Sequence, residues 1–202
     1  FLCLTIWILA GLPILVLSLN FAAYGQTNIS GVINTVSARI DSVYSYISTD
    51  VDSVHVNSVE GFSVGDTVMV HMTVGGYFYT SGGNVGDMSG RNNSGKYAIF
   101  ILKDIDNTNK YLILNSTLPN FSPLVTGEYG QIVKIPTFKS AIITDTLTCN
   151  PYDPATGTGG ILVLFVKGNL IFNADINVDG KGFPGADPDM AEYSGTCSTL
   201  DA

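Results

Sequence analysis

Short runs of β-branched and aromatic residues, each ended by Gly, Pro, Asn or Asp, dominate this sequence after its first 25 residues. Such runs, about four to eight residues long, are typical of strands. No stretch of about a dozen residues has the apolar spacing of a helix face with capping residues at both ends. The best helical candidate, residues 34–46, is rich in Val, Ser and Thr, which favour extended structure. The sequence therefore predicts an all-β fold.

Several of these runs alternate between apolar and polar side chains. Thr67 to Val74 places Val68, Val70, Met72 and Val74 on a core face and His71 on a wetter one. Residues 97–105 and 111–114 flank a polar Asp-Asn-Thr-Asn segment, which predicts a hairpin, and residues 82–95 predict a long exposed loop. Further strands are predicted at 51–56, 131–135 and 141–144. Together they predict a small β-sandwich or barrel-like module over residues 26–146.

A second segment, residues 147–202, begins with a stretch of turn-forming residues. The apolar run 161–166 then predicts a strand buried on both sides. Strict alternation follows over 169–179 and predicts five inward side chains: Leu170, Phe172, Ala174, Ile176 and Val178. This segment holds too few strands to form its own core. We therefore interpret it as the start of a Gly-rich parallel β-solenoid that is truncated in this sequence.

The first 25 residues predict a signal peptide. No charged residue occurs from Phe1 to Gln26, and Pro13 interrupts an otherwise apolar run. The small residues Ala23 and Gly25 fit positions −3 and −1 of a cleavage site between Gly25 and Gln26. An uncleaved membrane anchor is the alternative. Cleavage would leave a secreted or outer-surface protein without a membrane span.

Charge and cysteine content narrow the classes of partner. Nine basic residues against seventeen acidic ones give a formal net charge of −8, which argues against nucleic acid as a partner. Removing the signal peptide leaves Cys149 and Cys197. In an exported protein this pair is a disulfide candidate, with two free thiols as the alternative.

Two binding sites are suggested by local motifs. Asp175, Asn177 and Asp179 match the opening of a calcium loop, but Ala186 stands where a bidentate Glu is required. The alternative is a solvated strand face, and no other cofactor is predicted. Tyr77, Phe78 and Tyr79 form an aromatic run next to the long loop and are candidates for glycan contact, with a half-buried packing role as the alternative.

Catalytic motifs are weak. His55 or His71 could join a Ser and an Asp on paper, but no GxSxG motif is present and both histidines lie on predicted strands. A polysaccharide lyase of the β-helix type would need a basic residue such as Arg39 or Arg91 beside paired carboxylates, and neither arginine has such neighbours in the sequence. We therefore assign no catalytic residue.

Longer motifs carry a family resemblance. In order, they are GFSVGDTVMV (61–70), GKYAIFILKDIDNTNKYLILNSTL (95–118), GQIVKIPTFKSAII (130–143) and GTGGILVLFVKGNLIFNADINVDGKGFPGADP (157–188). This order resembles the N-terminal region of large surface proteins that gliding-type bacteria export by type IX secretion. The resemblance implies a non-catalytic, adhesin-like structural role at the cell surface, with extracellular glycans or other surface proteins as partners. A glycan-active β-helix enzyme and a carbohydrate-binding module are the alternatives.

Overall fold

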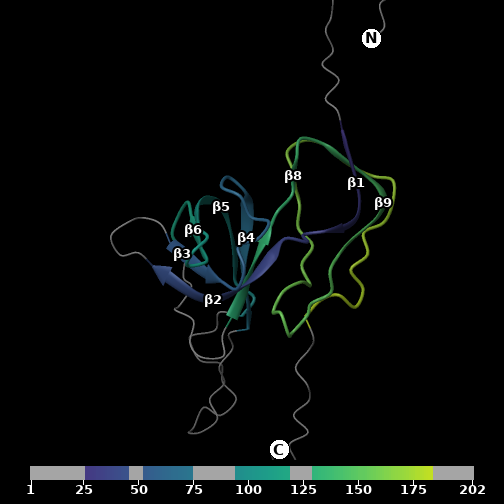
Figure 1. Cartoon of the computed structure of the whole chain (residues 1–202). Coiled ribbons are helices and arrows are strands. Elements are labelled where there is room, and N and C mark those ends of the chain that lie inside the picture. Colours follow the sequence, from purple (N-terminus) through teal and green to yellow (C-terminus); the bar gives the residue numbers. More distant parts are fainter. Residues whose placement is uncertain (1–25, 46–51, 75–93, 119–128, 184–202) are drawn as a thin grey trace, which may run out of the picture.

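The computed structural model describes residues 26–45, 52–74, 94–118 and 129–183 (Figure 1). All regular secondary structure in these residues is strand, which confirms the all-β class. The strands are β1 (Thr27–Ile33), β2 (Ser37–Ser45), β3 (Asp52–Val56), β4 (Thr67–Val74), β5 (Tyr97–Asp106), β6 (Tyr111–Leu114), β7 (Tyr129–Lys134), β8 (Thr137–Phe138), β9 (Ala141–Cys149), β10 (Phe165–Val166) and β11 (Leu170–Phe172).

Six strands close into a barrel in the order β2-β3-β6-β5-β4-β7, seen on the left in Figure 1. Every neighbouring pair is antiparallel, from β2 with β3 round to β2 with β7. Closure leaves no barrel strand with an unpaired edge. Of the two architectures expected for this module, the barrel is the one observed.

The barrel interior follows from the alternation in its strands. In β4, Val68, Val70 and Met72 point inward and are fully buried, as their spacing predicts. Val68 and Val70 belong to one core formed by side chains of the barrel strands and of two adjoining loop residues: Ala38, Ile40, Val54, Val56, Phe62, Val68, Val70, Phe100, Leu102, Leu112, Leu114, Leu118 and Ile132. Burying each large aliphatic side chain contributes about 1.5–3 kcal/mol, so this core stabilises the closed sheet.

The hairpin between β5 and β6 is fixed by Asp106. Its carboxylate accepts hydrogen bonds from the backbone N–H groups of Thr108 and Asn109, both at 2.9 Å, and from the Asn109 side chain at 2.8 Å. Lys110 then takes a positive φ of 55°, which turns the chain into β6. The predicted hairpin with a polar tip is confirmed, and the turn holds residues 107–110 in a defined position.

The remaining strands pair in parallel, on the right of Figure 1. β9 lies between β1 and β11, and β8 pairs with β10. Partners on β8–β10 and β9–β11 are 28 or 29 residues apart, as in Thr137 with Phe165 and Ala141 with Leu170. In a parallel β-solenoid, each coil of the chain pairs in parallel with the next coil, so the parallel pairing seen here is the pairing that a solenoid requires. The solenoid itself stays a prediction.

The barrel interrupts this parallel stack. The chain leaves the stack after β1, forms β2 to β7, and returns to the stack through β8 and β9. This division differs from the predicted boundary between residues 26–146 and 147–202, which falls inside β9. The sequence did not reveal that β1 and β9 are neighbours, because their pairing joins residues more than a hundred positions apart.

The apolar run 161–166 corrects a prediction. Only Phe165 and Val166 form a strand, β10, and Phe165 is 44% exposed, so the predicted doubly buried strand is wrong. One side of the run, Leu162, Leu164 and Val166, packs on the core of the parallel stack, around Ile143 and Leu147. On the other side Ile161 and Val163 are half-buried and Phe165 is exposed, so a continuous apolar run here does not mean burial on both faces.

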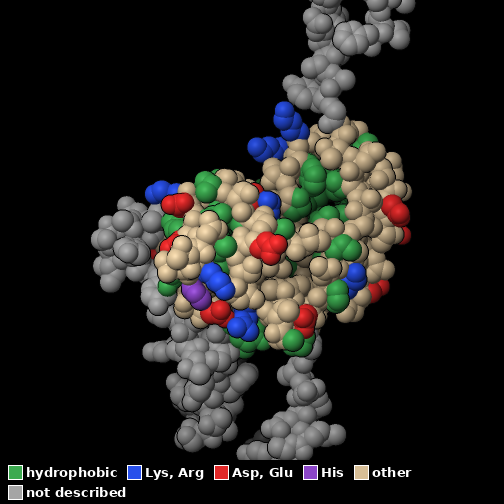
Figure 2. All heavy atoms as spheres, viewed as in Figure 1, with side chains coloured by type: hydrophobic (Ala, Val, Ile, Leu, Met, Phe, Trp, Pro, Cys, Tyr) green, Lys and Arg blue, Asp and Glu red, His purple; other side chains and the backbone are tan. Residues whose placement is uncertain are grey.

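The predicted inward set on 170–178 is also wrong in part. Leu170 and Ala174 pack against the core of the parallel stack, whereas Phe172 is 60%, Ile176 40% and Val178 44% exposed. β11 lies at the edge of its sheet, with β9 as its one neighbour within the described residues. Figure 2 shows hydrophobic side chains on the surface over the parallel stack.

Candidate functional site

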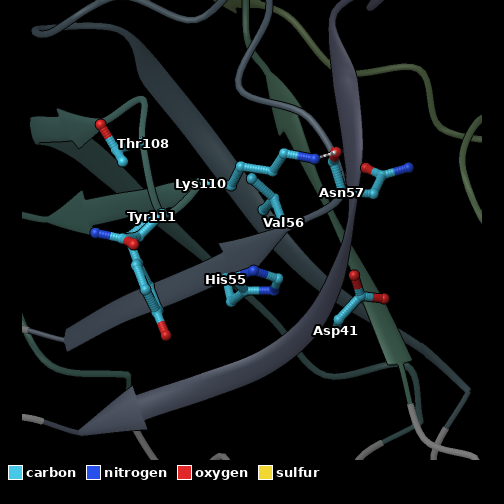
Figure 3. A pocket seen from close by; sticks show the side chains of 8 residues that line it. Asp41, His55, Val56, Asn57, Thr108, Lys110 and Tyr111 are labelled. Atoms are coloured by element: carbon cyan, nitrogen blue, oxygen red, sulfur yellow. Dashed lines mark hydrogen bonds between the residues drawn. The ribbon is translucent and has the colours of Figure 1, made fainter.

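An open groove of about 620 Å³ lies on the barrel, where β2 and β3 meet the β5–β6 hairpin (Figure 3). The lining residues come from three parts of the sequence: Asp41, His55, Val56, Asn57, Thr108, Asn109, Lys110 and Tyr111. The volume is within the range of about 300–1,000 Å³ that is common for small-ligand sites. We name this site the hairpin groove.

An aromatic pair forms one wall of the hairpin groove. His55 on β3 and Tyr111 on β6 are directly opposite in the antiparallel register. Their ring centroids are 5.3 Å apart and the ring planes meet at 67°, an edge-to-face contact. In Figure 3 the His55 ring lies between Tyr111 and Asp41. Cross-strand pairing thus fixes both rings without any contribution from a loop.

Hydrogen bonds hold the opposite wall of the groove. Arg39 Nε binds Asp41 Oδ1 at 2.7 Å, and the backbone N–H of Arg39 donates to Asn57 Oδ1 at 2.9 Å. Lys110 Nζ reaches the backbone carbonyl of Asn57 at 3.2 Å, the bond drawn in Figure 3. These contacts tie the hairpin to the end of β3. The groove is therefore shaped before any ligand arrives.

The hairpin groove carries charges of both signs. Asp41 supplies a carboxylate and Lys110 an ammonium group, and Arg39 is already paired with Asp41. Figure 2 shows Lys or Arg and Asp or Glu side chains close together on the barrel, near a histidine. No hydrogen bond within the described residues joins His55 to a carboxylate or a hydroxyl group. The groove therefore offers donors, acceptors and ring surfaces suited to binding.

His71 lies elsewhere, where the barrel meets the parallel stack. Its ring stacks on Phe183 at a centroid distance of 5.3 Å and an interplanar angle of 1°, and Tyr152 contacts Phe183 edge-to-face at 4.8 Å. The Tyr152 hydroxyl lies 3.2 Å from the Tyr129 hydroxyl. His71 lies on the less buried face of β4, as expected, and it is half-buried there because its ring stacks on Phe183.

Burial changes the acid–base behaviour of this contact. Desolvation lowers the pKa of His71 below its ordinary value. Desolvation, together with the hydrogen bond shared with the Tyr129 hydroxyl, raises the pKa of Tyr152 to about 12. Both side chains are therefore neutral at pH 7, which suits a packed interface between barrel and stack.

The calcium candidate occupies an exposed segment beyond β11, in which Ile176 forms a parallel bridge with Leu147. Asp175, Asn177 and Asp179 are all exposed, and Asn177 Oδ1 accepts the backbone N–H of Asp179 at 2.9 Å. The backbone carbonyl of Asp175 accepts the N–H of Leu147 from β9. No cluster of three or more His, Cys, Asp or Glu side chains that could hold a metal occurs among the residues described. Calcium binding stays a prediction.

Cys149 is buried, with 1% of its surface exposed, and burial raises the pKa of its thiol. Its predicted partner Cys197 lies outside the described residues, as do Tyr77, Phe78, Tyr79, Arg91 and Gly25. Gln26, next to the predicted cleavage site, is the first residue described and is exposed. In the described part of the chain, no helix has the length and apolar content to cross a membrane.

Arg39, a candidate for the base of a lyase, is held by contacts with its neighbours in the fold. Besides its bond to Asp41, its guanidinium lies 6.0 Å from the centre of the Tyr129 ring, and its side chain packs where a Cβ on Gly157 would be. Within the described residues, the guanidinium of Arg39 pairs with one carboxylate and not with two. The sequence did not point to Asp41, Tyr111 or Lys110, because only the pairing of β2, β3 and β6 brings them together.

Comparisons with known proteins give little. No protein-family model matches this chain, and no curated protein matches it. Among solved structures it is similar to the Gp54 tailspike of Acinetobacter baumannii bacteriophage AP22, solved in complex with A. baumannii capsular saccharide, at 12% identity and a TM-score of 0.34. The likeness covers 76% of this chain and 25% of the tailspike chain, so this chain spans a quarter of that length. A likeness with this TM-score does not carry saccharide binding over from the tailspike to this chain.

Proposed function

We propose that this chain belongs to a secreted or cell-surface protein of adhesin-like, non-catalytic function, in which the barrel is a binding module carried by the parallel stack. The observation that carries the proposal is the insertion of a closed barrel between β1 and β8, which belong to two parallel sheets that pack on one core. Both chain connections of the barrel enter the same stack. A module attached in this way keeps a fixed orientation relative to its support.

Two polar side chains, the half-buried Asn34 and the buried Gln131, support a rigid attachment. Asn34, just after β1, donates to the backbone carbonyls of Lys134 and Val163 at 3.1 and 2.8 Å and accepts the N–H of Val163 at 2.9 Å. Gln131 on β7 is fully buried and exchanges two hydrogen bonds with the backbone of Gly159, at 2.9 and 3.0 Å. Breaking such a bond inside the protein leaves an unpaired polar group, at a cost of about 1–3 kcal/mol.

Composition and resemblance support the location. The apolar start, the low content of charged residues, 13%, and the 22 glycines suit a chain that folds outside the cell. The order of the four motifs resembles exported surface proteins of the type IX secretion class. Extracellular glycans or other surface proteins are then the partners to test first.

A test must separate binding from turnover. The full chain, immobilised through its C-terminus, is exposed to a panel of neutral and uronate-containing oligosaccharides, and binding is followed by biolayer interferometry. The same mixtures are incubated for a day and examined for new reducing ends and for unsaturated uronates by ultraviolet absorbance. We expect binding with no product.

Two outcomes contradict the proposal. Cleavage products would establish the glycan-active enzyme alternative instead. Absence of binding to every member of the panel, and to whole bacterial and host cell surfaces, would remove the adhesive role. The control for the binding assay is a sensor without protein, which reveals adsorption of the oligosaccharides that does not depend on the chain.

A further inference from the structure

We infer that the hairpin groove is a binding site for a neutral oligosaccharide, an inference that rests on the proposed adhesive function and gives it a site and a ligand class. The site differs from the aromatic run at residues 77–79 that the sequence suggested. It is built from β2, β3 and the β5–β6 hairpin, all parts of the closed barrel.

The first argument is the supply of uncommitted polar atoms. Within the described residues, the Thr108 hydroxyl, Asn57 Nδ2 and Asp41 Oδ2 make no hydrogen bond, although other atoms of the same three residues do. The His55 ring nitrogens likewise have no described partner. A sugar ring presents hydroxyl groups that both donate and accept, so a mixed set of one hydroxyl, one amide and one carboxylate oxygen matches it.

The second argument is pre-organisation. The backbone N–H of Thr108 donates to the Asp106 carboxylate. Arg39 positions the other two side chains, because its backbone N–H donates to Asn57 and its guanidinium donates to Asp41. The ring of Tyr111 is held by its edge-to-face contact with His55. Polar atoms that are already fixed lose little conformational entropy on binding, which matters for a ligand held mainly by hydrogen bonds.

The third argument is charge. A site for phosphate or a polyuronate needs more positive than negative charge. The groove is lined by one cation, Lys110, and one anion, Asp41, and the neighbouring Arg39 is paired with Asp41. The whole chain has a formal net charge of −8, which repels polyanions further. Balanced local charge favours a neutral ligand. An aromatic ring beside hydrogen-bonding groups suits the apolar faces and polar edges of a pyranose.

The test compares groove variants with matched controls outside the groove. Thr108→Ala and Asp41→Ala remove uncommitted atoms. Thr146→Ala and Asp145→Ala make the same chemical changes at exposed residues of β9. Each full-length variant is checked for folding by circular dichroism and thermal unfolding. Affinity is then measured by titration calorimetry for neutral hexasaccharides of glucose, mannose, galactose and N-acetylglucosamine, and for oligogalacturonate.

We expect the wild-type chain to bind at least one neutral hexasaccharide. The affinity should change little between about 50 and 200 mM salt, because salt screens interactions between charges and a neutral ligand makes few of them. Thr108→Ala and Asp41→Ala should weaken binding about tenfold or more, as the loss of one hydrogen bond to a charged or fixed partner does. Both β9 controls should bind like wild type.

The outcomes separate the site from the function. If wild type binds a glycan and both folded groove variants bind it equally well, the hairpin groove is not the site, although the adhesive function stands. Preference for oligogalacturonate with steep salt dependence overturns the neutral ligand class. If wild type binds no glycan and no cell surface, the proposed function fails and the site fails with it.

Discussion

Asn34 and Val163 stand 129 positions apart in the sequence, and the Asn34 side chain exchanges two hydrogen bonds with the Val163 backbone, at 2.8 and 2.9 Å. The amide thereby acts as a backbone group would in a strand pair. Asn34 also has a positive φ of 59°, at the point where the chain leaves β1 for the barrel. One residue therefore sets the direction of the barrel entry and joins it to the segment before β10.

Replacing Asn34 tests this connection. Asn34→Gly keeps the positive φ accessible but removes the amide, so we expect the free energy of unfolding to fall by about 1–3 kcal/mol, because the Val163 N–H and carbonyl lose their partner. Asn34→Ala should be worse, since it adds backbone strain. Urea unfolding followed by circular dichroism measures both. Equal stability of Asn34→Gly and wild type would show that the bonds to Val163 contribute nothing.

Gly159 is predicted to be intolerant of any side chain. It has a φ of 92°, and an added Cβ would lie 2.2 Å from the carbonyl oxygen of Pro151. Gly159→Ala should displace the turn and break the two bonds to Gln131, lowering the melting temperature by several degrees or preventing folding. Gly180→Ala is the control, because Gly180 has a φ of 67° with open space around its Cα.

Thermal unfolding of the two variants gives the comparison. The control carries backbone strain of about 1 kcal/mol alone, so it isolates the steric part of the effect. A Gly159→Ala protein as stable as Gly180→Ala would contradict the close packing of residue 159 on residue 151.

His71 makes stability depend on pH. Burial lowers its pKa in the folded protein below the ordinary value of 6.5, so the unfolded chain binds a proton first as the pH falls. The contribution of neutral, buried His71 to the free energy of unfolding is therefore fully present above pH 6.5, and it is lost as the pH falls from 6.5 through the lowered pKa of the folded protein. Its Nδ1 is buried without a hydrogen-bond partner in the described residues, which adds to the cost of protonation.

Urea unfolding at a series of pH values between neutral and mildly acidic measures this slope. His71→Phe retains a ring to stack on Phe183 and should flatten the slope. An unchanged slope in His71→Phe would assign the pH dependence to other groups.

Cys149 should react slowly with alkylating reagents in the folded protein. It is 1% exposed and burial raises its pKa, so both access and the thiolate fraction are low. Iodoacetamide labelling, followed by peptide mass spectrometry, should modify Cys149 only after unfolding. If the unfolded chain is labelled at Cys149 only after a reductant is added, the predicted disulfide with Cys197 is present. Rapid labelling of the native chain would contradict the burial.

Much of the barrel could be predicted from local patterns. The strand Thr67–Val74 and the polar hairpin tip at residues 106–109 were predicted because alternation and turn-forming residues act within a few positions. The candidate site could not. Asp41, His55 and Tyr111 carry no common motif, and only the register of β2, β3 and β6 makes them neighbours.

The sequence by itself determined that the chain is all-β, where most strands of the barrel begin and end, and which side of β4 faces a core, because these depend on side-chain alternation and turn chemistry. Tertiary structure decided that β1 pairs with β9, that Phe183 covers His71 and that the barrel interrupts the parallel stack. Those contacts join distant segments. Their free energy depends on shape, register and shared burial in three dimensions, which no local pattern contains.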